Sequence, residues 1–204
     1  MNEESVLAGY CLPDSEIKEL MKNGVITNGS ANLVEQSGVD LTLYKIYGYS
    51  GPGFIGKNER ILPEKKEIEP VGGKYELMKG KYYDIIFNEG CKFPNNISAI
   101  INPKSSTNRC GTWVTRRFLD KEYTITSGFY DPGYKADHIA ALLIVNNDYD
   151  FKTETGAPLA KMMFFKSLTP VIKSYNKKRT KSSNGEIATD GCKILNMQKT
   201  MDDF

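Results

Sequence analysis

A tight turn ahead of a buried strand is encoded by residues 128–134, GFYDPGY, and by the run that follows at 138–145, HIAALLIV. The Asp-Pro-Gly sequence at 131–133 is typical of such a turn, because proline presets its own φ and glycine tolerates a positive φ. The turn brings one carboxylate, Asp131, close in sequence to one aromatic ring, Tyr134. A carboxylate beside a bound polyphosphate can act as a base toward water. These two residues are therefore the first candidates for a catalytic site.

The upstream segment at residues 103–111, PKSSTNRCG, supplies side chains of the types that hold phosphate. An Arg guanidinium gives charge-assisted hydrogen bonds to phosphate oxygens, and Ser hydroxyls add further donors. Both segments also have a purely structural interpretation. Most Asp residues in Asp-Pro-Gly turns only cap the turn, and a Lys-Ser-Ser run can be a solvated loop.

Short strands continue on both sides of these segments. Residues 39–44 alternate between apolar and polar side chains, and residues 85–87 and 97–101 are apolar runs bounded by turn residues. Residues 159–165 are expected to form another buried strand. Many short strands with few helices are typical of a β-sandwich or β-barrel. The sequence therefore predicts a mainly β protein.

A short helix is expected near the N-terminus. Asp14 can cap it, Ile17, Leu20 and Met21 fall on one face, and Gly24 suits its end.

The composition is that of an ordinary globular protein, with 204 residues, 40% hydrophobic residues and a net charge of +2. The small net charge gives no reason to expect nucleic acid as a partner. The four cysteines lack CxxC spacing, and with the single His138 they form no zinc signature. We find no signal peptide and no apolar run long enough for a membrane span, and expect a cytoplasmic protein with reduced thiols. We expect a β domain over residues 1–172 and a basic, polar tail over 173–204.

Several segments, in the same order along the chain, resemble the dUTPase/dCTP deaminase family. The layout is closest to the dCTP deaminase branch and covers about residues 12–181. The matching segments are residues 12–17 (LPDSEI), 23–26 (NGVI), 37–41 (SGVDL), 75–80 (YELMKG), 93–96 (FPNN), 104–109 (KSSTNR) and 175–178 (YNKK). The resemblance implies a distorted β-barrel of the jelly-roll type that assembles as a homotrimer.

The resemblance also implies roles for individual residues. Residues 104–109 are similar to the family's Arg-Ser-Ser-x-x-Arg motif, so Ser105, Ser106 and Arg109 would hold phosphate, with Lys104 in the first place. Lys161 stands where the family usually has Gln. Further implied positions are Asp40, which would reach a metal only through water, and Tyr175 and Lys181 in the tail, which would close over a triphosphate.

The residues favour dUTPase chemistry over deamination. In the metal-free deaminases a Glu on the strand after Asp-Pro-Gly shuttles the proton, and by count that place falls at Ala141 or, with a slip of one residue, Leu142. Gly128 and Tyr134 fit the dUTPase pattern Gly-x-x-Asp-x-x-Tyr, whose Tyr packs against deoxyribose. In that interpretation Asp131 orients a water, and Mg²⁺ bound to the triphosphate of dUTP neutralises charge on the leaving pyrophosphate.

Two alternatives remain open at this point. The chain could be a dCTP deaminase with an atypical base. It could also be a catalytically weakened homologue that binds deoxynucleotides or a protein partner as a regulator. The missing Glu argues against the first alternative, and the retained Asp131 and Tyr134 argue against the second.

Overall fold

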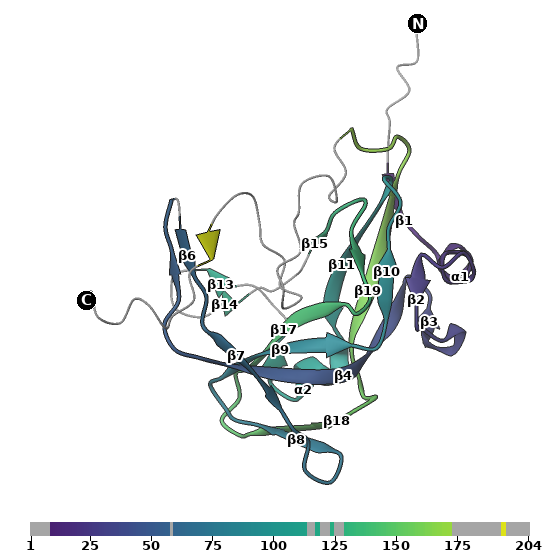
Figure 1. Cartoon of the computed structure of the whole chain (residues 1–204). Helices are drawn as coiled ribbons and strands as arrows, with labels where there is room; N and C mark the ends of the chain where they lie inside the picture. Colours follow the sequence, from purple (N-terminus) through teal and green to yellow (C-terminus); the bar gives the residue numbers. More distant parts are fainter. Residues whose placement is uncertain are drawn as a thin grey trace, which may run out of the picture.

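The structure is a computed structural model of the chain, and it describes residues 9–57, 59–113, 117–118, 123–124, 129–172 and 193–194. The protein is mainly β and is built around one curled sheet (Figure 1). The order across this sheet is β12 (Thr112–Trp113), β17 (Ala140–Val145), β9 (Tyr82–Phe87), β4 (Gly38–Ser50), β19 (Pro158–Ser167), β11 (Ile97–Pro103) and β15 (Phe129–Tyr130). Beside this path, β1 (Gly9–Cys11) pairs with β19, and β3 (Val34–Glu35) and β7 (Glu64–Ile68) pair with β4. The predicted mainly β fold is confirmed.

The long strand β4 curls the sheet because its two halves have different partners. Residues 39–42 pair with β19, whereas residues 43–48 pair with β9. A bulge between Leu43 and Lys45 inserts one residue, so Leu43 and Ile46 are both buried while Tyr44 is exposed. The alternation predicted for residues 39–44 is therefore correct, but it resumes beyond the bulge in shifted phase.

The hydrophobic core fills the inside of the curl. It is built from the inward positions of β4, β9, β11, β17 and β19, where alternate side chains face the same side of the sheet. The largest fully buried side chains include Phe87, Phe93 and Phe164, and the last two meet edge to face with ring centroids 5.9 Å apart.

The predicted N-terminal helix is present as α1 (Asp14–Lys22), but its expected cap is wrong. Pro13, not Asp14, is the N-cap residue, and it makes no side-chain capping hydrogen bond. Because Asp14 is already the first helical residue, its carboxylate pairs one turn later with Lys18 at 3.1 Å. Gly24 ends the helix as expected, with a positive φ of 68°.

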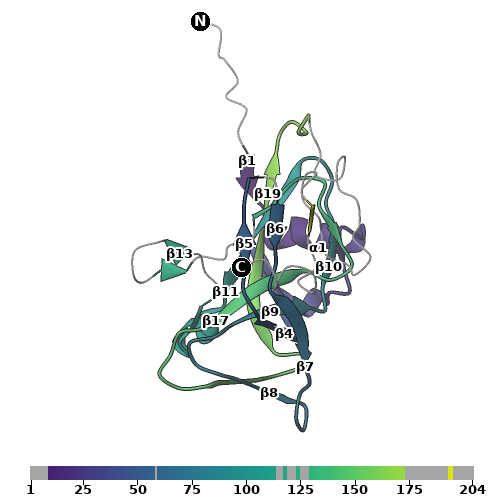
Figure 2. The same ribbon diagram turned by 60° about the vertical axis from the view of Figure 1, so that its left-hand side comes forward.

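Smaller sheets flank the main one. One joins β16 (Lys135–Ala136), β10 (Gly90–Lys92) and β2 (Ile26–Thr27), and another joins β18 (Phe151–Glu154) with β8 (Lys74–Leu77). A hairpin of β5 (Phe54–Ile55) and β6 (Glu59–Ile61) projects from the sheet (Figures 1 and 2), and β20 (Lys193–Ile194) pairs in parallel with β6. The remaining described elements are β13 (Arg117–Phe118), β14 (Tyr123–Thr124), α2 (Ser105–Arg109) and the 3₁₀ turn η1 (Ala31–Leu33). Among the described residues, no helix is long and apolar enough to cross a membrane.

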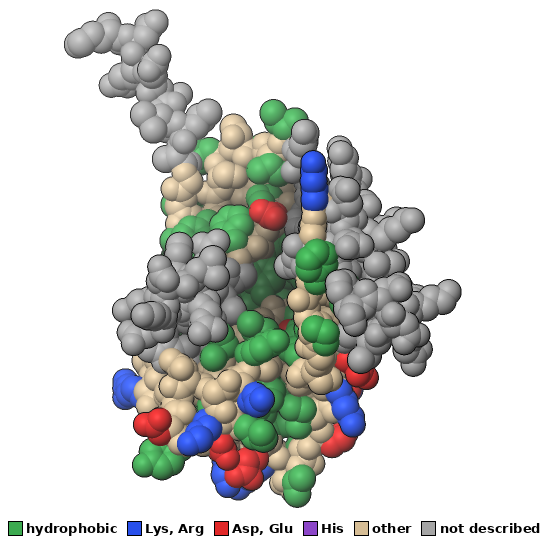
Figure 3. All heavy atoms as spheres, turned by 90° about the vertical axis from the view of Figure 1, so that its left-hand side faces the viewer, with side chains coloured by type: hydrophobic (Ala, Val, Ile, Leu, Met, Phe, Trp, Pro, Cys, Tyr) green, Lys and Arg blue, Asp and Glu red, His purple; other side chains and the backbone are tan. Residues whose placement is uncertain are grey.

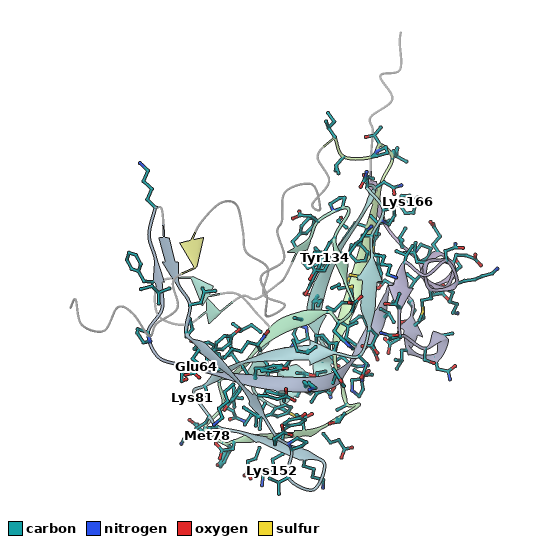
Figure 4. All side chains as sticks on the ribbon, in the orientation of Figure 1. Glu64, Met78, Lys81, Tyr134, Lys152 and Lys166 are labelled. Atoms are coloured by element: carbon teal, nitrogen blue, oxygen red, sulfur yellow. The ribbon has the colours of Figure 1, made fainter. Side chains whose placement is uncertain are left out.

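One face of the molecule has a hydrophobic hollow in its middle and charged side chains below it. In Figure 3 this face is hollowed along its middle, and hydrophobic side chains are visible in the hollow. Charged side chains of both signs gather on its lower part. Figure 4 shows Glu64, Lys81 and Lys152 in the lower part of the molecule.

Candidate active site

Asp131 is held on a rigid turn with its carboxylate left free. The backbone N–H of Tyr134 donates to the Asp131 carbonyl at 3.1 Å, and Gly133 has a φ of 85°, which together define a type II turn. The turn is tied down from outside, because Gly133 N–H donates to the Pro94 carbonyl at 3.2 Å. The exposed Asp131 carboxylate makes no hydrogen bond or ion pair with another described residue, so it does not cap the turn.

Tyr134 is positioned by aromatic packing. Its half-buried ring lies 5.1 Å from the ring of Tyr130 and 6.5 Å from that of Phe93, measured between centroids. Its carbonyl accepts from Phe93 N–H at 2.8 Å. Tyr130 is itself fixed, since its hydroxyl donates to the Ala140 carbonyl at 2.6 Å. Burial raises the pKa of that hydroxyl well above its ordinary value, which keeps it protonated as a donor.

The expected phosphate segment forms the short helix α2, which is anchored at the start of β19. Thr107 is buried, and its hydroxyl donates to the Leu159 carbonyl at 2.7 Å. The backbone N–H of Lys104 donates to the same carbonyl at 3.2 Å. The expected ligands Ser105, Ser106 and Arg109 are left exposed. The anchoring residue Thr107 was not predicted, because it lies within the motif and only its burial reveals its role.

Asp40, Lys104 and Lys161 lie together, and Glu35 joins them. The Lys104 ammonium pairs with the Asp40 carboxylate and lies 3.7 Å from a Glu35 oxygen, while Lys161 pairs with the other Glu35 oxygen. We call these four residues the charge cluster. Asp40 is buried, and its Oδ1 has no hydrogen-bond partner among the described residues. The sequence predicted three of the four members but missed Glu35, which carries no motif signal.

The charge cluster and Asp131 lie at opposite ends of β11. In the antiparallel pairing of β11 with β15, Tyr130 is opposite Ala99, so Asp131 lies near the Ile97 end of β11. Lys104 follows Pro103 at the other end of the same strand. The intervening strand of about six residues spans about 20 Å at about 3.3 Å per residue. Figure 1 shows the same separation between α2 and β15, and Figure 4 places Tyr134 on the same side as Lys166, which pairs with Ile97. No side chain spans that distance, so one chain does not bring its phosphate segment to its own Asp131.

In deaminases the proton-shuttling Glu lies on the strand that corresponds to β17. This strand has the sequence AALLIV here and contains no Glu. Ala141 pairs with Ile85 and faces the core, and Leu142 pairs with Asp84 of β9. Asp84 was missed by sequence reasoning, because only the register places it opposite Leu142. Its side chain points to the opposite side of the sheet from Ala141 and pairs with Lys65. Asp84 therefore does not fill the place at Ala141, and on the Leu142 side its carboxylate is already paired with Lys65.

The remaining expected site residues, Gly128, Tyr175 and Lys181, lie outside the described residues. Within the described parts of the chain, no group of three or more His, Cys, Asp or Glu side chains is arranged to hold a metal ion.

A family model described as dCTP deaminase-like matches residues 11–167, more than half of the chain. The chain belongs to this dCTP deaminase-like family. The resemblance found in the sequence is therefore confirmed.

Relatives of this family member include proteins named for dUTP hydrolysis. A protein of Methanosarcina mazei named "Probable deoxyuridine 5'-triphosphate nucleotidohydrolase" is 30% identical over 160 residues, which cover 77% of this chain and 84% of the relative. A protein of the same name from Aeropyrum pernix is 27% identical over 158 residues, which cover 78% of this chain and 91% of the relative. The 2'-deoxycytidine 5'-triphosphate deaminase of Agrobacterium tumefaciens has a similar fold, with a TM-score of 0.59 at 17% identity. That match covers 78% of this chain and 47% of the deaminase chain.

Proposed function

We propose that this dCTP deaminase-like protein is a dUTP diphosphatase that hydrolyses dUTP to dUMP and pyrophosphate. The observation that carries the proposal is the free carboxylate of Asp131 on a braced turn, beside a β17 strand that contains no carboxylate. Asp131 would accept a hydrogen bond from a water and direct it at the α-phosphate, which is general-base catalysis. The names of the relatives from Methanosarcina mazei and Aeropyrum pernix support the same substrate.

The phosphate segment would hold the triphosphate. Arg109 offers a bidentate guanidinium, and Ser105 and Ser106 offer hydroxyl donors from the exposed side of α2. Lys104 and Lys161 add positive charge beside them, although each is already paired with a carboxylate.

The donor set fits a magnesium ion that arrives with the nucleotide. Asp40 is the acidic residue next to the phosphate segment with an unfilled acceptor, and a single buried carboxylate does not make a metal cage. The triphosphate oxygens would supply the direct ligands, and Asp40 would interact through water. The ion would neutralise charge on the leaving pyrophosphate.

We further propose that the site is shared between subunits of a homotrimer. The separation of about 20 Å along β11 leaves Asp131 without phosphate ligands from its own chain. In a closed, symmetric assembly α2 of one subunit can approach the Asp131 turn of the next.

The proposed activity is tested by incubating the protein with dUTP, dCTP, dTTP and UTP, each with Mg²⁺, and resolving the products by chromatography. We expect dUMP and pyrophosphate from dUTP. Ammonia released from dCTP would replace the proposal with deamination, and tight dUTP binding without product would favour a regulatory homologue.

Replacing Tyr134 by Ala is expected to narrow the preference for dUTP over UTP by about tenfold or more, because the ring that blocks a 2′-hydroxyl is removed. The measurement is kcat/KM for both nucleotides. Tyr134→Phe keeps the ring and its packing on Tyr130, so it serves as the control and should keep the preference. An unchanged ratio in the Ala variant would show that Tyr134 does not face the sugar.

A further inference from the structure

The charge cluster contains an ion pair that is built into the strand pairing. Lys161 on β19 is directly opposite Asp40 on β4, yet its ammonium reaches past that neighbour to Glu35 on β3. Its path crosses Gly38, the residue opposite Glu35 in the β3–β4 pair. A Cβ at Gly38 would lie 2.7 Å from the Met162 carbonyl oxygen and 2.8 Å from Lys161 Cγ, so a side chain there would clash with the β19 backbone and with Lys161.

The two carboxylates of the charge cluster are not held equally. The Asp40 side chain is 8% exposed and is fixed on β4, whereas the Glu35 side chain is 42% exposed at the rim. Lys104 pairs with Asp40 and stays 3.7 Å from Glu35. Hydrogen bonding to Lys161, with its positive charge and that of Lys104, holds the pKa of Glu35 below its ordinary value, so Glu35 is ionised at neutral pH.

The formal charge of the charge cluster is zero, because two lysines face two carboxylates. A phosphate that approaches Lys104 and Lys161 therefore competes with carboxylates that already occupy them. Asp40 cannot move away without leaving its buried position, but Glu35 can turn into solvent. Glu35 is the member that can yield its place to an anion.

We propose that Glu35 is a positioning residue that competes with bound phosphate for Lys161 and Lys104 and so limits the affinity of the site for pyrophosphate. This inference rests on the proposed function, because pyrophosphate is a product of the proposed reaction. The negative charge of Glu35 would favour its release. Glu35 holds the two ammonium groups in place in the free site and is displaced when phosphate oxygens take over its contacts.

The test measures inorganic pyrophosphate binding to the full chain by calorimetry, without turnover. Glu35→Gln keeps the size of the side chain and removes its charge, and we expect it to tighten pyrophosphate binding by about tenfold at low salt. The gain should shrink as ionic strength rises, because the Debye length falls to about 8 Å at 0.15 M. Merely structural damage at Glu35 would weaken binding instead.

Two further variants separate the mechanism from a general charge effect. Glu76→Gln removes the same charge from an exposed pair with Lys152, 2.9 Å apart on β8 and β18, and it should leave pyrophosphate affinity unchanged. In a Lys161→Gln background, Glu35→Gln should tighten binding much less, because the competed ammonium is gone. Equal gains from Glu76→Gln and Glu35→Gln, or the same gain with and without Lys161, would overturn the proposal.

Failure of this inference is distinguishable from failure of the proposed function. Unchanged or weaker pyrophosphate binding in Glu35→Gln overturns the role of Glu35, even if the wild-type protein hydrolyses dUTP. Pyrophosphate that binds neither the wild type nor Glu35→Gln overturns it as well. Tighter binding in Glu35→Gln by a protein that leaves dUTP intact supports the role of Glu35 and removes only the diphosphatase assignment.

Discussion

Replacing Asp131 by Asn is expected to lower the turnover of dUTP by about 10²–10⁴-fold, the scale usual for a group that transfers a proton in the rate-limiting step. The amide has the shape of the carboxylate but cannot accept the proton of the attacking water. Nucleotide affinity should change little, because the Asp131 carboxylate contacts no other described residue and the turn is held by backbone hydrogen bonds. The measurement is single-turnover hydrolysis together with the dissociation constant of a non-hydrolysable dUTP analogue.

Asp137→Asn is the matched control for this variant. Asp137 is an exposed carboxylate six residues further along the same segment, just before β17. Its replacement changes net charge equally and should leave turnover near the wild-type value. Equal losses in both variants would point to charge alone, and unchanged turnover in Asp131→Asn would remove this residue from the mechanism.

Mixing two inactive variants is expected to restore activity if the sites are shared between subunits. An Arg109→Ala subunit keeps Asp131, and an Asp131→Asn subunit keeps Arg109, so a site between them can contain both intact residues. With random mixing in equal amounts, the subunit that supplies Arg109 to a site is intact in about half of the cases, and so is the neighbour that supplies Asp131. About one quarter of the sites in a cyclic trimer should therefore be complete. The measurement is dUTP hydrolysis after subunits have been exchanged, compared with each variant alone.

The control for the mixing experiment shows that subunits have exchanged. Native mass spectrometry detects mixed assemblies if the two variants differ in mass. The double variant, Arg109→Ala with Asp131→Asn in one chain, should give no recovery with either single variant. Confirmed mixed trimers without restored activity would place both residues in a site made by one chain. That result would conflict with the separation of Asp131 from Lys104 along β11.

Much of the fold could be predicted because its signals are local. The type II turn follows from Pro132 and Gly133, since proline presets the φ of the first central position and glycine tolerates the positive φ of the second. The apolar run at 97–101 and the buried strand predicted at 159–165 both lie within strands of the curled sheet. The predicted cap of α1 was wrong because both Pro13 and Asp14 suit the start of a helix. Which of them is the N-cap depends on a backbone hydrogen bond from Asp14 N–H to the carbonyl of distant Gln36.

The charge cluster could be predicted only in part, because it depends on strand register. Glu35 and Lys161 are 126 residues apart in sequence and meet only through the pairing of β3, β4 and β19. The same limit hid Asp84, which the register of β9 and β17 places opposite Leu142. A slip of one residue in either pairing would turn these side chains to the other face of the sheet, and no local pattern specifies which register wins.

The place of β19 in the sheet has a consequence for how the protein is made. β19 lies between β4 and β11, yet in the sequence it comes after every other strand of the curled sheet. While the chain leaves the ribosome, β4 and β11 therefore keep unpaired edges and an uncovered apolar face until residues 158–167 emerge. Such late, long-range closure is slow and exposes the nascent chain to aggregation. The last strand of the curled sheet to be synthesised is thus the one that lets the earlier strands of this sheet close.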